Sequence, residues 1–257
     1  MIPLMSGFQE EYAAIYDLLY PEKNYEEESQ LVRKVINEFR PDAKILLDYG
    51  CGTGKHAKEL ASHGFDVWGL DKNESMLKIA RERLRDVPNI ELRHVEDRDL
   101  IPPDSVDVCT TLFDVISYMN TNEEIIDFLS YVRRILTKKG LLIFDFWYGP
   151  GVVALGPEKR RKEFDLGEQS LLRLTSPQHD RDACVVTVTH KVVLSEKERI
   201  VSRFSDVHRM RYFFPNEIRL FLVHQGLELL KIGTWQDLDA PPQTNDWSAL
   251  AVARVVE

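Results

Sequence analysis

The sequence predicts an α/β fold, in which a doubly wound, mostly parallel sheet of seven strands carries an antiparallel β insertion before the last helix. Two observations predict it. Between residues 44 and 147, short apolar runs alternate with helical segments, as expected for buried parallel strands covered by helices on both faces. Between 150 and 212 the helical period disappears, and β-branched and aromatic residues show partial alternation, which is typical of antiparallel strands.

Each element has its own signal along the chain. Buried strands are expected at 44–49, 66–70, 90–94, 106–111 and 140–147. A first helical segment follows the capping-box spacing of Asn24 and Glu27 and runs to about Phe39. Further helices are expected from the glycine-rich turn to 62, over 75–84, and from the capping box of Thr121 and Glu124 to about 139–140. A helix at 215–225 and strands at 227–235 and 248–255 complete the sheet.

Composition excludes several classes of protein. The 33 basic and 42 acidic residues give a net charge of −9, which argues against a broad nucleic-acid surface because phosphate backbones require clustered positive charge. The three cysteines are far apart and have no metal-ligand spacing, so no metal site is expected. The chain shows no signal peptide and no apolar run of membrane length. We therefore expect a cytoplasmic protein with a small-molecule substrate, and a homodimer is left open.

A glycine-rich turn is the strongest functional signal. The segment ILLDYGCGTGKHAKEL, residues 45–60, places an apolar strand, an acid, three glycines and a helix in that order. Such a turn lets a ligand approach the backbone, and the N–H groups that begin the helix attract anions. Lys55 stands where a dinucleotide-binding fingerprint needs Gly or Ala, which counts against an NAD-dependent oxidoreductase. Asp71 ends the second strand, where an acid can accept both ribose hydroxyls of a nucleoside.

The chain resembles the class I S-adenosylmethionine-dependent methyltransferases, whose fold is Rossmann-like. Four segments carry the resemblance in order: DYGCGTG, GLDKNESMLKIA, HVEDRDL and VDVCTTLFDVISYM. The resemblance implies S-adenosylmethionine as cofactor, with Asp48 at its α-amino group, Asp71 on the ribose, Met76 and Asp97 at adenine, and Leu112 at the methionine moiety. The full set of cofactor residues that it implies is Asp48, Gly50, Gly52, Thr53, Gly54, Asp71, Lys72, Met76, Asp97, Arg98, Leu112 and Phe113. We expect one methyltransferase domain over 1–257, with a cofactor-binding core at 44–147 and an inserted lid at 150–212.

A narrower resemblance concerns the acceptor. The segments AAIYDLLYPEKNYEEE and FSDVH, together with Tyr118 after the fourth strand, resemble the nucleotide-amino-sugar N,N-dimethyltransferases. This implies an amino sugar on a nucleotide as substrate, with Tyr16, Tyr25, Tyr118 and His208 as substrate-binding residues and Tyr118 and His208 as catalytic residues. If FSDVH is part of a strand, its Phe204, Asp206 and His208 share one face.

Two further expectations remain open at the level of sequence. A diphosphate would need cations, and the insertion offers Arg160, Arg161, Lys162, Arg203, Arg209 and Arg211. Methyl transfer to a hydroxyl of another small metabolite and a non-catalytic cofactor-binding role are the alternatives to amine methylation.

Overall fold

The main sheet has the seven strands that the sequence predicted, and their order in the structure is β4-β3-β2-β5-β6-β12-β11. The structure is a computed structural model, and it describes residues 5–6, 10–197 and 199–256. All neighbouring pairs from β4 to β6 are parallel, and β12 is antiparallel to both β6 and β11. The strands are β2 (Ile45–Tyr49), β3 (Asp66–Asp71), β4 (Ile90–His94), β5 (Val106–Thr111), β6 (Leu136–Tyr148), β11 (Leu227–Gly233) and β12 (Ser248–Val255).

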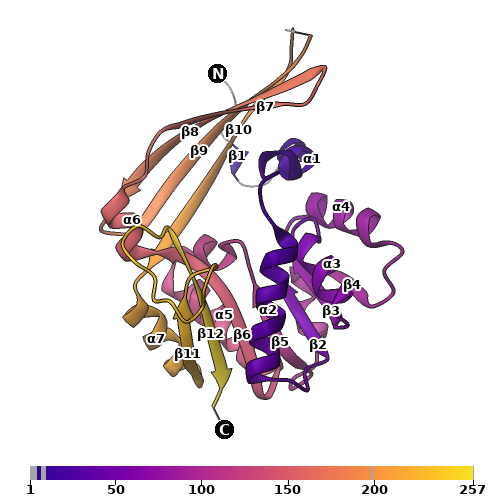
Figure 1. The fold of residues 1–257 in the computed structure, drawn as a ribbon, viewed down its shortest axis with the longest axis vertical. Coiled ribbons are helices and arrows are strands. Elements are labelled where there is room, and N and C mark those ends of the chain that lie inside the picture. The colour runs from indigo at the N-terminus through magenta and orange to yellow at the C-terminus, as the bar shows by residue number, and fades with distance from the viewer. Residues whose placement is uncertain (1–4, 7–9, 198, 257) are drawn as a thin grey trace.

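Helices cover both faces of this sheet because the strands present apolar side chains on both (Figure 1). One core lies between the sheet and the helices α5 (Asn122–Ile135) and α7 (Pro215–His224). The other lies between the sheet and the helices α2 (Tyr25–Phe39), α3 (Lys55–Ser62) and α4 (Glu74–Leu84). Short 3-10 helices, η1 (Val95–Leu100) and η2 (Val115–Tyr118), follow β4 and β5. The carboxyl ends of β2, β3, β5 and β6 therefore open toward the same edge of the sheet.

Local signals explain most element ends, and one prediction was wrong. Asn24 accepts a hydrogen bond from the Glu27 backbone at 3.1 Å, and Thr121 and Glu124 form a reciprocal capping box. Helix α5, however, ends at Ile135, four residues before the predicted end. Residues from Leu136 onward already belong to β6, which pairs with β5 through a register shift, and Lys139 has a φ of 60°. In the sequence, residues 139–140 resembled the end of a helix, but in the structure they form this irregular part of β6.

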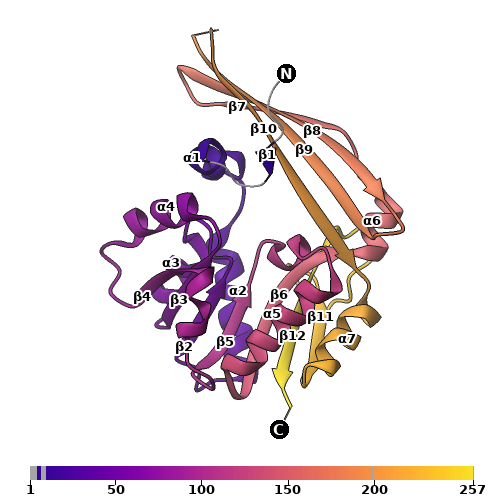
Figure 2. The same cartoon turned by 180° about the vertical axis from the view of Figure 1, so that it is seen from behind.

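The insertion forms a four-stranded antiparallel sheet, which we call the lid. Its strands are β7 (Arg160–Asp165), β8 (Gln169–Asp180), β9 (Val185–Glu196) and β10 (Arg199–Phe213), and the short helix α6 (Gly149–Leu155) precedes them. The lid meets the main sheet where Tyr212 and Phe213 of β10 pair with the end of β6. The two views in Figures 1 and 2 show the lid projecting beyond the carboxyl edge of the main sheet, with helix α1 (Glu10–Leu19) beneath it. A short strand β1 (Met5–Ser6) pairs with β10.

None of the helices within the described ranges is long and apolar enough to cross a bilayer. Within the same ranges, no cluster of His, Cys, Asp and Glu side chains could hold a metal ion.

Candidate functional site

A cavity of about 930 Å³ lies between the carboxyl edge of the main sheet and the inner face of the lid. Its floor includes the glycine-rich turn and the ends of β3 and β5, and its roof is made of β8, β9 and β10. Helix α1 and the start of α2 close one side with tyrosines. One continuous space thus joins the predicted cofactor residues to the predicted acceptor residues.

The three glycines of the turn have different roles. Gly50, Gly52 and Gly54 all have positive φ angles, 82°, 54° and 78°, so the turn needs the freedom of glycine at each. A Cβ on Gly50 would lie 2.7 Å from Val115, and one on Gly54 would lie 2.6 Å from Leu84. A Cβ on Gly52 would meet no heavy atom of the described chain within 4 Å, and Gly52 lines the cavity. Gly52 therefore leaves space that a ligand can fill.

Asp71 fits a ribose. Its two carboxylate oxygens accept hydrogen bonds of 2.8 Å from the backbone N–H groups of Gly52 and Asn73, which fix the carboxylate at the cavity wall. Each oxygen keeps a second lone pair for a ligand hydroxyl. Burial raises the pKa of Asp71, and the two backbone hydrogen bonds oppose that rise.

Asp48 lies deeper than Asp71 and is 2% exposed. Its Oδ1 accepts a hydrogen bond from Thr110 at 3.2 Å, while its Oδ2 has no hydrogen-bond partner among the described residues. Burial raises its pKa to about 6. Because a buried carboxylate oxygen without a partner is costly, this atom fits a cationic or hydrogen-bond-donating ligand group. Asp48 is not among the residues that line the cavity.

The remaining cofactor candidates fall into two groups. Thr53, Lys72, Met76, Leu112 and Phe113 line the cavity. The side chains of Asp97 and Arg98 do not, since Asp97 is exposed and Arg98 forms an ion pair with Asp127 at 2.8 Å. Val95, two residues before Asp97, lines the cavity in this segment.

The acceptor candidates Tyr118 and His208 are in direct contact. The Tyr118 hydroxyl lies 2.9 Å from His208 Nδ1, and His208 Nε2 lies 3.2 Å from Asp206 Oδ2. Asp206 and His208 are 1% and 4% exposed, so this chain of contacts is shielded from solvent. Burial raises the pKa of Tyr118 well above its usual value, so that the phenol is neutral at neutral pH. Asp206 was not predicted as a site residue, although its spacing of two from His208 on a strand places it on the same face.

Tyrosines from the N-terminal segment complete the wall. Tyr16 and Tyr25 line the cavity, as does Tyr20, which lies in the same tyrosine-rich segment but was not among the predicted substrate-binding residues. The ring centroids of Tyr16 and Tyr20 are 5.2 Å apart, and the Tyr20 ring meets Phe113 edge to face at 5.0 Å. Asp17 holds α1 in place, because it accepts from Thr53 at 3.0 Å and pairs with Lys55 and Arg83.

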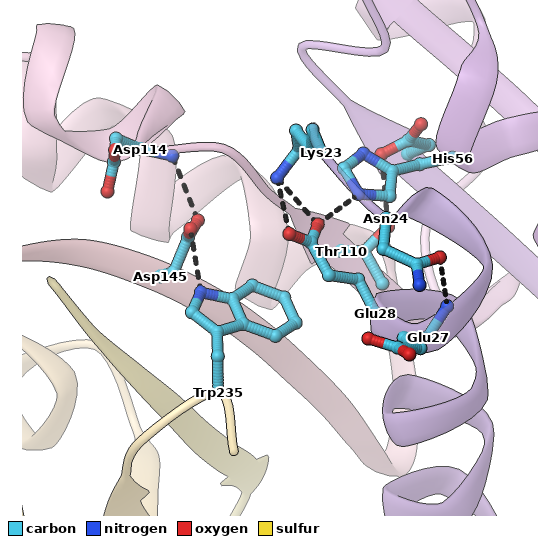
Figure 3. A network of polar contacts seen from close by, with 10 residues as sticks. Lys23, Asn24, Glu27, Glu28, His56, Thr110, Asp114, Asp145 and Trp235 are labelled. Carbon is cyan, nitrogen blue, oxygen red and sulfur yellow. Dashed lines mark hydrogen bonds and ion pairs between the residues drawn. The ribbon is translucent and has the colours of Figure 1, made fainter. Parts of the chain in front are cut away.

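A polar network supports the same wall from behind (Figure 3). Glu28 accepts from Lys23 at 2.6 Å and contacts His56 at 2.7 Å. Asp145 accepts from the Asp114 backbone at 2.9 Å and from the Trp235 indole at 3.2 Å. These contacts fix the turn after β5, where Phe113 and Asp114 both have left-handed φ angles, 68° and 61°.

Most of the predicted lid cations lie outside the cavity. Arg160 lines it. Arg161 pairs with Glu163, Lys162 pairs with Glu22, and Arg211 is buried against Glu217. Arg203 and Arg209 are exposed and do not line the cavity. Sequence reasoning missed Arg173 on β8, whose place on the inner face depends on strand register.

Comparison with known proteins identifies the core. Residues 46–140 match the family described as "Methyltransferase domain". The chain carries an S-adenosylmethionine-dependent methyltransferase domain. The enzyme is 26% identical over 227 residues to dTDP-3-amino-3,4,6-trideoxy-alpha-D-glucopyranose N,N-dimethyltransferase of Streptomyces venezuelae, covering 86% of this chain and 92% of the relative. It is 25% identical to dTDP-3-amino-3,6-dideoxy-alpha-D-glucopyranose N,N-dimethyltransferase of Streptomyces fradiae, covering 87% and 86%.

The likeness in fold extends over the lid of the methyltransferase. The structure of the sugar N-methyltransferase KedS8 from Streptoalloteichus sp. superposes with a TM-score of 0.80 at 23% identity, covering 100% of this chain and 99% of that chain. At this identity the likeness establishes the fold, including the antiparallel insertion.

Proposed function

We propose that this methyltransferase transfers a methyl group from S-adenosylmethionine to the amine of a small molecule, an amino sugar carried on a nucleotide. The observation that carries the proposal is the single cavity, in which the Tyr118 hydroxyl lies between the glycine-rich turn and the lid. Full-length similarity to two N,N-dimethyltransferases that are named for dTDP-linked amino sugars supports this acceptor class.

In the proposed site, the cofactor lies along the glycine-rich turn. Asp71 holds the ribose, Gly52 leaves room for the ligand, and Met76 contacts adenine. Asp48 faces the amino group from below the turn through its unpartnered Oδ2, and Leu112 and Phe113 border the methionine end. Val95 lines the cavity in the segment that carries Asp97 and Arg98, and we assign Asp97, at the exposed rim, and the backbone N–H of Arg98 to the edge of adenine. The cofactor supplies an electrophilic methyl group on a sulfonium, with a neutral leaving group.

The lid residues then position the acceptor. Asp206 beside Nε2 of His208 favours the tautomer with its proton on Nε2, so that Nδ1 accepts a hydrogen bond from Tyr118. With its proton donated to Nδ1, the Tyr118 oxygen can accept a hydrogen bond from the acceptor N–H and orient its nitrogen. After transfer, the new ammonium can give a proton to Tyr118 while Tyr118 gives its own to His208, and Asp206 stabilises the resulting imidazolium. Tyr16 and Tyr25 enclose the acceptor from the side of α1.

Methyl transfer to a hydroxyl is the second candidate, and the contacts among Asp206, His208 and Tyr118 favour it. A buried carboxylate, an imidazole and a phenol in sequence can withdraw the proton that a hydroxyl must lose.

A panel of acceptors separates the two. We expect methylation, followed by mass spectrometry, of an amino sugar linked to a nucleotide, with slower turnover of the free amino sugar and of matched sugars bearing only hydroxyls. Preferred methylation of a hydroxyl or phenol would refute the proposal that the acceptor group is an amine. Equal rates for the free and the nucleotide-linked amino sugar would refute the proposal that the sugar is carried on a nucleotide.

A further inference from the structure

One wall of the cavity holds Arg173, a cation that has no counter-ion among the described residues. Arg173 lies on β8, on the inner face of the lid, and lines the cavity. Its guanidinium carbon lies 5.3 Å from the centre of the Tyr20 ring and 5.7 Å from that of Phe164. Its Nε is buried and has no hydrogen-bond partner among the residues that the structure describes, and no carboxylate within those residues forms an ion pair with it.

Arg173 differs from the other cations that line the cavity. Lys55 pairs with Asp17, and Lys72 and Arg160, which have no ion pair among the described residues, are exposed, whereas Arg173 is partly buried. Lys162, which is directly opposite Arg173 on β7, pairs with Glu22 outside the cavity. A partly buried charge without a partner is costly, so chains seldom keep one in a wall without use. In a protein with a net charge of −9, an unpaired guanidinium in a cavity is a marked exception.

The surroundings of Arg173 favour an oxyanion. Arg160 of β7 also lines the cavity, and it lies opposite Thr175, two residues along β8 from Arg173. His190 is opposite Thr175 on β9, and its Nδ1 lies 3.0 Å from the Thr175 hydroxyl. Burial, with the neighbouring His208 and Arg173, lowers the pKa of His190 to about 3. His190 is therefore neutral at neutral pH and can offer a hydrogen bond without adding a charge that would repel a cationic amine.

We infer that Arg173, with Arg160 at the rim, binds an oxyanion of the acceptor, such as the phosphates of its carrier or a carboxylate. A guanidinium presents paired N–H donors that match phosphate or carboxylate oxygens. Its guanidinium lies over the rings of Tyr20 and Phe164, and these cation–π contacts help to hold it in place. The inference rests on the proposed function, because it assigns the charged part of the acceptor to the β8 end of the lid and the amine to Tyr118.

The test measures binding of small anions to the enzyme saturated with S-adenosylhomocysteine. The probes are uridine diphosphate, inorganic pyrophosphate, glutarate as a dicarboxylate, and uridine as an uncharged reference. We expect one of the anions to bind, and Arg173→Met to weaken it at least tenfold while affinity for S-adenosylhomocysteine stays unchanged. Methionine keeps apolar contact with Tyr20 and Phe164, so the packing is largely preserved. Arg161→Met is the matched control, because Arg161 points away from the cavity and pairs with Glu163.

The outcomes distinguish the possibilities. Stronger binding of the phosphates than of glutarate assigns the site to a phosphorylated carrier, and the reverse assigns it to a carboxylate. Absence of anion binding in the wild type, or equal binding by wild type and Arg173→Met, would overturn the inference. Equal losses of anion and S-adenosylhomocysteine affinity would show a structural role and overturn it as well. Because the titration needs no methyl transfer, failure of every amine in the turnover panel would refute the proposed function without deciding the role of Arg173.

Discussion

Asp206 shows how one side chain can set the chemistry of another. It contacts His208 on the side opposite to Tyr118, and both members of this pair are buried. A carboxylate in this position fixes the imidazole tautomer, whereas an amide of the same shape can hold either one. We therefore expect Asp206→Asn to lower kcat for the acceptor by about tenfold or more, with an unchanged Kd for S-adenosylhomocysteine.

The readout for Asp206→Asn is steady-state kinetics together with calorimetry. Asp180→Asn, at the exposed far end of β8, serves as the control. If Asp206→Asn raised KM for both ligands and left kcat unchanged, Asp206 would serve the packing of the lid rather than the reaction.

The charged form of the buried Asp48 carboxylate lowers the stability of the ligand-free folded protein. Its pKa is raised to about 6 by burial, above the value of about 3.9 in an unfolded chain. The folded state therefore binds the proton more tightly, and the stability that protonation gives is present below about pH 4 and lost as the pH rises through 6. Asp48→Asn removes the charge, so we expect the ligand-free variant to be more stable than wild type at pH 8 by on the order of 3 kcal/mol. Its Tm should therefore be higher than that of wild type at pH 8 and equal to it near pH 4.

Thermal unfolding at several pH values checks this, with Asp66→Asn as an exposed control. The same Asp48→Asn variant should bind S-adenosylmethionine less tightly, because the neutral amide no longer attracts its amino group. A variant that is less stable than wild type at pH 8 would contradict the argument.

At the scale of elements, the glycine-rich turn offers a matched pair of positions. Gly52 and Gly64 both have positive φ, 54° and 94°, and neither would bring a Cβ within 4 Å of the described chain. Alanine at either position costs backbone strain on the order of 1 kcal/mol. Of these two glycines, only Gly52 lines the cavity. We expect both variants to lose similar stability and only Gly52→Ala to lose affinity for S-adenosylhomocysteine, as measured by calorimetry. Equal affinities would place the cofactor away from the turn.

Elements with periodic or capped sequences were predictable, and those that depend on pairing were not. The runs 106–111 and 248–255 coincide with β5 and β12, because central strands are apolar on both faces. The run 90–94 coincides with β4, an edge strand that is only partly buried. The start of β6 was missed, since the Lys139 irregularity resembles a helix end. In the lid, strand alternation put Asp206 and His208 on one face, but which lid cations face the cavity depends on the registers of β7, β8 and β9. No local signal marked Arg173 as a cavity residue, whereas Tyr20 belongs to the tyrosine-rich segment that the sequence pointed to for the acceptor.

At the scale of the whole molecule, the lid and the core share few backbone pairs. Within the described residues, backbone pairing between β10 and β6 is confined to the Tyr212–Trp147 and Phe213–Tyr148 positions, side-chain contacts such as Tyr118–His208 add to it, and α1 lies beneath the lid. The cofactor is expected to contact the core and α1, whereas the acceptor must reach both Tyr118 and the inner face of β8 and β9. Acceptor binding should therefore tie the lid to the core in a way that cofactor binding does not.

Hydrogen exchange measures this directly. We expect S-adenosylhomocysteine alone to slow amide exchange in the glycine-rich turn and in α1, and addition of the acceptor or of the tightest anion to slow exchange in β8 and β9 as well. The reason is linkage: a ligand at 100 times its Kd adds about 2.7 kcal/mol to the stability of the segments that must open to release it. Protection of β8 and β9 by S-adenosylhomocysteine alone, with no further change on adding the anion, would mean that the lid belongs to the cofactor site. In Arg173→Met, the same anion concentration should no longer slow exchange in β8 and β9, while S-adenosylhomocysteine should still slow exchange in the glycine-rich turn and in α1.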